Sequence, residues 1–229
     1  MNPVARVVST VALAATAFFT LTAFQTLPAD AQLAIHWNVD GFADGFAERE
    51  ALLLLPAIFG LTALLTALAI RFDPKRDNIV RSAEALGYVG MGLVLLFAVT
   101  QSAIINSGYG EAARLDHAVP IVLGALFVLL GYAAPQIKQN YTIGVRLPWT
   151  LESVAAWDAA HVTVGRAWIV TGAVTALLGV IPTDIVDLGA APLLVFFIGL
   201  VSSVVVATYV AYTTFSAGER SRKRLWRKR

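Results

Sequence analysis

Residues 188–217 read LGAAPLLVFFIGLVSSVVVATYVAYTTFSA, a stretch of 30 residues without a charged side chain. A helix needs roughly 20 residues to cross about 30 Å of hydrocarbon, so this stretch is long enough to span a membrane. Five further uncharged stretches of 17 to 22 residues precede it, at residues 7–27, 51–70, 85–106, 118–137 and 167–183. None of the six shows the alternation of a membrane β-strand. The sequence therefore predicts an all-α integral membrane protein with six transmembrane helices.

The amino-acid composition agrees with this fold class. Hydrophobic residues make up 58% of the chain and charged residues only 14%, with a mean hydropathy of +0.71. Soluble domains average about 25% charged residues. A water-soluble protein with so few charges could not cover its surface with polar groups. The chain also has no cysteine, which excludes disulfides, a thiolate nucleophile and cysteine-ligated metal sites.

Lysine and arginine residues are distributed unequally between the two sides of the predicted membrane. If the N-terminus is cytoplasmic, 15 of the 17 basic residues lie on the cytoplasmic side and only Arg49 and Arg114 lie outside. Cytoplasmic loops of membrane proteins carry such an excess, so both termini are predicted to be cytoplasmic. Cleavage of the first stretch as a signal peptide after Ala31 is an alternative. We favour an uncleaved span because the apolar run exceeds a typical signal-peptide core.

The six stretches carry no charged residue, although such residues usually mark ion and proton pathways in membranes. The chain also lacks the phosphate-binding loop of ATP-driven machines and the commoner hydrolase signatures. We therefore expect neither enzymatic activity nor a cofactor. Small residues recur at every fourth position in the last stretch, at Gly199, Ser203, Ala207 and Ala211. They predict close helix packing, either within the chain or in a homodimer.

The first connecting segment, residues 28–50, is predicted to be a small ordered cap outside the membrane. Apolar residues alternate from Leu33 to Val39, which predicts a short strand. Asp40-Gly41 and Asp44-Gly45 are both typical of turns.

The candidate ligand-facing residues of this cap are His36, Trp37, Asn38, Asp40 and Asp44. We favour a structural cap, with two alternatives. An extracytoplasmic ligand such as a cationic or amphipathic peptide would suit the acidic outer face. A metal ion could accept the imidazole of His36 and the carboxylates of Asp40 and Asp44, although their spacing matches no strong metal motif.

The inner segment at residues 138–166 reads KQNYTIGVRLPWTLESVAAWDAAHVTVGR. Gly144 and Pro148 predict a turn, and Thr150 predicts a helix N-cap. From residue 151 the apolar residues follow helical spacing, at Leu151, Val154, Trp157, His161 and Val164. We expect an amphipathic interfacial helix here, anchored by aromatic side chains and leading into the fifth span. His161 on its apolar face is interpreted as a packed, hydrogen-bonded histidine.

Two parts of the chain resemble known families. The inner sequence NYTIGVRLPWTL at residues 140–151, followed by Trp157 and His161, resembles the signature of the SdpI family of bacterial membrane proteins. Leu27-Pro28 and the run from Ile35 to Asn38, with Gly41 and Asp44, resemble the small extracytoplasmic domain of unknown function that often precedes it. The resemblance makes these inner residues candidates for partner binding: Asn140, Gly144, Arg146, Pro148, Trp149, Trp157 and His161.

The resemblance implies an immunity and signalling protein in a bacterial cell membrane. Such a protein would bind a peptide toxin outside and a cytoplasmic repressor inside. The residues themselves leave two alternatives, a small-solute or lipid transporter and a membrane enzyme acting on lipid headgroups through His36, Asp40 and Asp44. Arg146 has three interpretations, namely pairing with lipid phosphate, partner binding and a structural salt bridge.

The C-terminal residues 220–229 contain seven basic residues in ten. We expect this tail to lie on the anionic inner leaflet, with contact to an acidic partner or nucleic acid as the alternative. The predicted organisation is a first span with the cap at residues 1–50, spans two to four at 51–137, the SdpI-like region at 138–217 and the basic tail at 218–229.

Overall fold

A computed structural model describes residues 2–110, 115, 117–181, 185–186 and 188–226. Its elements are α1 (Pro3–Thr26), β1 (Leu33–Trp37), β2 (Ala43–Ala47), η1 (Arg49–Leu53), α2 (Leu54–Arg71), α3 (Arg76–Arg81), α4 (Ala83–Gly108), α5 (Ala118–Ala133), η2 (Ala134–Gln136), α6 (Pro148–Glu152), α7 (Val154–Val180) and α8 (Ala191–Trp226). Six of the described helical segments are long and apolar enough to cross a membrane. The predicted six-helix membrane fold is confirmed.

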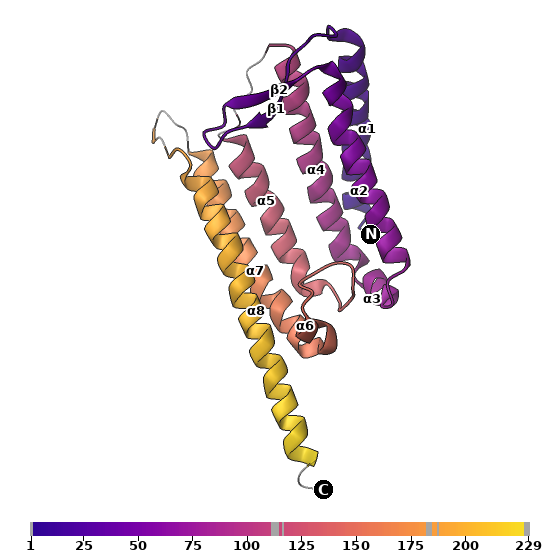
Figure 1. Cartoon of the computed structure of the whole chain (residues 1–229), viewed down its shortest axis with the longest axis vertical. Helices are drawn as coiled ribbons and strands as arrows, with labels where there is room; N and C mark the ends of the chain where they lie inside the picture. Colours follow the sequence, from indigo (N-terminus) through magenta and orange to yellow (C-terminus); the bar gives the residue numbers. More distant parts are fainter. Residues whose placement is uncertain (1, 111–114, 116, 182–184, 187, 227–229) are drawn as a thin grey trace.

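The helices run alongside one another as a bundle with two distinct ends (Figure 1). Helices α1, α2 and α4 lie on one side, α5, α7 and α8 on the other, and α4 packs on α5 between them. The β1–β2 hairpin covers one end, which we call the hairpin end. The opposite end carries α3, α6, the N-terminus and the segment from Ile137 to Ser153, which we call the elbow. We call this the elbow end.

Helices α5 and α7 pack closely because glycines face each other across their contact. A Cβ atom added to Gly124 would lie 2.7 Å from the backbone nitrogen of Ala176, and one added to Gly131 would lie 2.6 Å from the carbonyl oxygen of Gly165. Only residues without a side chain allow two backbones to approach this closely.

The predicted small-residue seam of the last span packs against α7. Ala207 and Ala211 are fully buried. The indole nitrogen of Trp168 donates a hydrogen bond of 3.0 Å to the hydroxyl of Ser203. Gly199 lies against the side chain of Thr171. The seam therefore serves packing within the chain.

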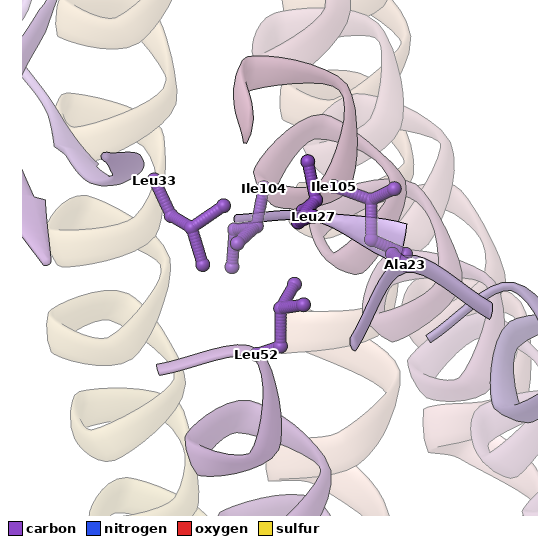
Figure 2. Packing of buried hydrophobic residues seen from close by; sticks show 6 residues of the cluster. All are labelled: Ala23, Leu27, Leu33, Leu52, Ile104 and Ile105. Atoms are coloured by element: carbon purple, nitrogen blue, oxygen red, sulfur yellow. The ribbon is translucent and has the colours of Figure 1, made fainter. Parts of the chain in front are cut away.

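The hairpin is attached to the bundle by a cluster of apolar side chains. Figure 2 shows this cluster, which consists of Ala23, Leu27, Leu33, Leu52, Ile104 and Ile105. The backbone N–H of Ala34 also donates to the hydroxyl of Ser107 at 2.9 Å, which joins β1 to α4. The predicted cap is thus an ordered part of the fold.

One predicted turn of the cap is wrong. Asp40-Gly41 forms a turn as expected, with Gly41 at a φ of 78°. Asp44-Gly45 instead lies within β2, where Gly45 pairs with His36 of β1. The pairing requires a residue without a side chain, since a Cβ on Gly45 would lie 2.9 Å from the Cβ of His36.

The predicted inner helix leads into the fifth span as expected, but its bounds differ from the prediction. The chain forms the short helix α6, becomes extended at Ser153 and then begins α7, which continues without interruption to Val180. Trp157 and His161 are buried inside the protein and therefore do not serve as exposed aromatic anchors. The hydroxyl of Ser153 accepts from the N–H of Ala156 and caps α7, so this residue separates the two helices.

The basic tail continues α8 up to Trp226, and its last three residues, 227–229, lie outside the described part of the chain. At 1.5 Å per residue, the 36 residues of α8 extend about 54 Å, beyond the roughly 30 Å of hydrocarbon. Figure 1 shows the C-terminal part of α8 projecting beyond the other helices at the elbow end. Up to Trp226 the tail therefore continues α8 as one helix, and its position on the anionic inner leaflet stays a prediction.

Candidate functional site

The elbow begins with a tight turn built around the buried side chain of Asn140. Its amide nitrogen donates to the carbonyl oxygens of Lys138 at 2.9 Å and Ile143 at 3.0 Å. Its amide oxygen accepts from the backbone N–H groups of Thr142 at 2.9 Å and Ile143 at 2.7 Å. An asparagine amide offers two donors and an acceptor with two lone pairs, so every one of these capacities is used here. Asn140 therefore shapes the elbow from within.

The imidazole ring of His161 forms a hydrogen bond with the backbone that follows this turn. The backbone N–H of Val145 donates to Nε2 of His161 at 3.1 Å, and Nδ1 of His161 lies 2.8 Å from the carbonyl oxygen of Trp157. A carbonyl oxygen can only accept, so Nδ1 carries the proton and Nε2 is the acceptor. The interpretation of His161 as a packed, hydrogen-bonded residue is confirmed.

Trp157 completes the buried part of the elbow. Its ring stacks on His161 with centroids 4.1 Å apart, and its indole nitrogen donates to the carbonyl oxygen of Ile137 at 2.7 Å. Gly144 passes directly over both rings with a φ of 128°, and a Cβ there would lie 2.8 Å from the Trp157 ring. The glycine is needed for both its backbone conformation and its lack of a side chain.

Helix α6 is fixed by Thr150, although this residue is not the predicted N-cap. Leu147 occupies the N-cap position, Pro148 follows at the first helical position, and Thr150 stands at the third. The hydroxyl of Thr150 accepts from the N–H of Leu147 and donates to the carbonyl oxygen of Val145, both at 2.8 Å. The threonine therefore reaches back to the start of its helix and closes the turn after Gly144.

The link between α2 and α3 contributes Asp73, which the sequence analysis missed. This buried carboxylate accepts hydrogen bonds from the N–H of Lys75 at 2.7 Å, the N–H of Tyr141 at 2.9 Å and the hydroxyl of Thr142 at 2.7 Å. Burial by itself would raise the pKa of Asp73. The hydrogen bonds from Thr142, Lys75 and Tyr141 outweigh it and hold the pKa below its ordinary value. Asp73 therefore ties the second span to the elbow as an anion.

Gln139 connects the same link to α6. Its side-chain nitrogen donates to the carbonyl oxygen of Thr150 at 2.6 Å, and its side-chain oxygen accepts from the ammonium group of Lys75. The backbone carbonyl of Gln139 accepts from Asn78 at 2.7 Å. Lys75 and Asn78 lie more than 60 residues before Gln139 in the chain, so no local sequence pattern could identify them as its partners.

The elbow and the start of α7 bring the seven predicted partner-binding residues together, but three of the seven are buried. Asn140, Trp157 and His161 are buried and cannot contact a partner in this structure. Trp149 is partly buried and packs edge-on against Tyr212, with the two ring centroids 5.5 Å apart. The exposed members are Gly144, Arg146 and Pro148. The family-like motif therefore mainly encodes the elbow's architecture.

Arg146 lies on the surface beside a groove between the elbow and α2. One of its guanidinium nitrogens donates to the carbonyl oxygen of Tyr141 at 2.7 Å. No carboxylate among the described residues forms an ion pair with it, which removes the salt-bridge interpretation for that part of the chain. The groove has a volume of about 580 Å³. Its α2 wall consists of Thr62, Leu65, Thr66 and Ala69.

At the hairpin end, the three candidate metal ligands do not form one site. Nδ1 of His36 lies 2.5 Å from a carboxylate oxygen of Asp44, and both side chains are exposed. Asp40 lies in the turn beyond the strands, where its N–H donates to the side chain of Asn38 at 3.0 Å. Among the described residues no group of three His, Cys, Asp or Glu could hold a metal ion. His36, Asp40 and Asp44 were the residues of both the metal-site hypothesis and the lipid-headgroup enzyme hypothesis. The structure does not bring these three side chains together.

A small cleft of about 240 Å³ lies beside the hairpin turn. Asn38 shapes the turn, because its side-chain oxygen accepts from the N–H groups of Asp40 and Phe42 at 3.0 Å each. The cleft is lined mainly by apolar groups from the hairpin and from the starts of α5 and α8, including Trp37, Val39, Val119, Pro120, Leu193 and Phe197. Of the five predicted cap residues, Trp37 and Asn38 line this cleft.

Comparison with known proteins finds matches to an N-terminal and a C-terminal segment of the chain. The model of the SdpI/YfhL protein family matches residues 136–211, which include the elbow, α7 and the membrane part of α8. A domain of unknown function, DUF1648, matches residues 11–60, which include the hairpin. The immunity protein SdpI of Bacillus subtilis (strain 168) is 21% identical over 191 residues, which are 82% of this chain and 85% of that protein. No solved structure matches the chain. The chain is therefore a multi-pass membrane protein in which a region similar to DUF1648 precedes a region similar to the SdpI/YfhL family.

Proposed function

We propose that this protein protects its host cell against a membrane-active peptide toxin that arrives from outside the cytoplasm. The observation that carries the proposal is the similarity to an immunity protein along 82% of the chain, with 85% of that protein covered. The two family models match residues 11–60 and 136–211, which include the hairpin and the elbow. The likeness therefore supports the proposal along most of the chain.

The cleft at the hairpin end is the proposed contact site for the toxin. It is lined mainly by apolar groups and includes the partly exposed side chains of Trp37, Leu193 and Phe197. An amphipathic peptide could bury an apolar side chain there while its basic groups face the acidic outer segments.

In the proposed orientation the hairpin end faces outside and both termini face the cytoplasm. The basic residues of the connecting segments support it, because Arg71, Lys75, Arg76, Arg81, Lys138 and Arg146 all belong to the elbow end. The elbow would then be the surface available to a cytoplasmic repressor, whose capture we include in the proposal. Its exposed contacts would be Arg146 and Pro148.

A toxin-challenge assay tests the immunity function. A sensitive host that expresses this protein is exposed to the secreted peptide encoded in the same genomic region. We expect survival to rise, and Trp37→Ala or Leu193→Trp to abolish the gain at equal membrane abundance. Leu194→Trp is the matched control, because Leu194 is 56% exposed on α8 and does not line the cleft. A host that dies despite normal membrane levels of the protein would contradict the proposal.

Repressor capture needs a separate readout. We expect Arg146→Ala to weaken recruitment of a fluorescent repressor to the membrane while toxin resistance is retained at least in part. Trp157→Ala is unsuitable for this comparison because Trp157 is fully buried and its loss would disturb the elbow itself. Equal loss of resistance and recruitment at matched protein level would show that the elbow serves only the fold.

A further inference from the structure

The groove between α2 and the elbow combines three features that together define a ligand class. Its α2 wall is apolar at Leu65 and Ala69 and carries the hydroxyl groups of Thr62 and Thr66. Its elbow wall includes the side chains of Ile143 and Arg146. No carboxylate lines it. A site of this kind suits a molecule with an apolar chain and an anionic head.

The groove lies on a membrane-spanning helix, so the ligand that suits it best is a membrane lipid. None of the residues of α2, all of which the structure describes, is buried, and apart from contacts such as the stacking of Phe59 on Phe97 most of its side chains are exposed. The groove lies along the last three turns of α2, from Thr62 to Ala69, and Arg146 belongs to its elbow wall. Apolar chains can therefore lie against α2 while a headgroup reaches the guanidinium group.

Charge complementarity specifies the headgroup. Arg146 uses one guanidinium nitrogen for the carbonyl oxygen of Tyr141, and that bond orients the group beside the groove. A guanidinium group has five N–H donors in a planar fork that matches phosphate oxygens. Asp73, in the link between α2 and α3, is buried, and its carboxylate oxygens accept hydrogen bonds from Lys75, Tyr141 and Thr142.

We propose that this groove binds one anionic phospholipid, with its phosphate on Arg146 and an acyl chain along Leu65 and Ala69. This proposal does not rest on toxin protection, but it uses the same Arg146 that we assign to repressor capture, so lipid binding is measured on the purified protein without a repressor. It would seat a lipid between the most lipid-exposed span and the rigid elbow, and so attach α2 to the remainder of the elbow end.

Native mass spectrometry of the full-length protein in detergent tests the proposal with phosphatidylglycerol and phosphatidylcholine as probes. We expect one phosphatidylglycerol to bind about tenfold more tightly than phosphatidylcholine. Arg146→Gln should remove that preference. Arg81→Gln should not, because Arg81 is exposed at the same end but does not line the groove. Equal effects of the two variants would indicate general charge attraction and would overturn the site.

A second pair of variants tests the apolar wall without touching the elbow's hydrogen bonds. Leu65→Trp should fill the groove and reduce phosphatidylglycerol binding about tenfold. Leu64→Trp is the control, because Leu64 is equally exposed on α2 but lies outside the groove. Inorganic phosphate at millimolar concentration should not compete, since it lacks the acyl chain. Unchanged lipid binding in Leu65→Trp, or full competition by inorganic phosphate, would overturn the proposal.

Discussion

At the residue scale, Gly144 carries two requirements that no other residue type meets. Its φ of 128° is a conformation that side chains disfavour, and its Cα faces the stacked rings of Trp157 and His161. An added methyl group must push aside a ring whose nitrogens are both engaged in hydrogen bonds. The elbow and the start of α7 therefore depend on this position together.

We predict that Gly144→Ala lowers the stability of the folded protein by about 2–5 kcal/mol, combining backbone strain with overpacking. Thermal unfolding of the detergent-solubilised protein, followed by fluorescence-detected size exclusion, measures the effect. Gly90→Ala is the matched control, because nothing lies within 4 Å of a Cβ there and Gly90 sits inside a helix. A Gly144→Ala protein that unfolds at the unchanged temperature would contradict the assigned conformation.

Asp73 provides a second prediction at this scale. In Asp73→Asn the amide nitrogen cannot accept a hydrogen bond, so at least one of the donors of Tyr141, Thr142 and Lys75 loses its acceptor. We expect a loss of about 1–3 kcal/mol at neutral pH. The exposed residue Asp77 supplies the control variant Asp77→Asn, which should unfold at nearly the original temperature.

The pH dependence of that loss follows from the lowered pKa of Asp73. The folded state binds the proton less tightly than the unfolded chain, so the carboxylate stabilises the fold fully above the ordinary aspartate pKa of about 4. This stabilisation disappears as the pH falls through the lowered pKa. The difference in unfolding temperature between the native protein and Asp73→Asn should therefore stay constant down to about pH 5 and shrink below about pH 4. A difference that grows on acidification would contradict the sign of the shift.

At the element scale, the α5–α7 contact depends on two glycines that touch the same region. A Cβ on Gly124 would meet the backbone of α7 at Ala176, and a Cβ on Gly172 would lie 2.9 Å from the backbone nitrogen of Val128 in α5. Backbone atoms cannot rotate away as a side chain can. Either substitution therefore has to push the two helices apart.

We predict that Gly124→Ala and Gly172→Ala each cost about 1–3 kcal/mol of stability. Their combination should cost clearly less than the sum, because one separation of the helices relieves both clashes. Gly60→Ala, at a position of α2 with open space around it, is the control and should leave the unfolding temperature unchanged or higher. Additive losses from the two substitutions would show that they act on different contacts.

At the scale of the whole molecule, the six crossings place the hairpin and the elbow at opposite ends of the bundle (Figure 1). The predicted topology puts Asp40, Glu111 and Asp187 outside and Lys75, Lys138 and Arg229 inside. Glu111, Asp187 and Arg229 lie outside the described residues. Asp40 in the hairpin turn and Arg76 in α3 are exposed at the two ends and can report the orientation.

Because the chain has no cysteine, single cysteines can be introduced into it without further changes. We predict that a membrane-impermeant maleimide labels Asp40→Cys in intact cells, whereas it labels Arg76→Cys only after the membrane is permeabilised. The cysteine-free parent controls for background labelling. Labelling in the reverse order would invert the topology and move the proposed toxin cleft to the cytoplasm.

The sequence by itself determined the number of spans and the position of the elbow. Both depend on properties of contiguous residues, since a helix must satisfy its own backbone within one apolar stretch to cross a membrane. Runs such as residues 188–217 therefore define α8 directly. The segment from Ile137 to Leu151 likewise folds mostly on itself, and its bonds to Trp157 and His161 reach at most 20 residues along the chain.

Only the tertiary structure decided which residues hold these parts together. Asp73 and Lys75 meet the elbow across 64 to 69 residues of sequence, so their roles depend on how α2 and α4 pack. Asp44-Gly45 reads as a turn in isolation, but strand pairing places Gly45 opposite His36. Trp157 reads as an interfacial aromatic residue, but the elbow folds over it and buries it. In each case the local preference was weak and a long-range contact outweighed it.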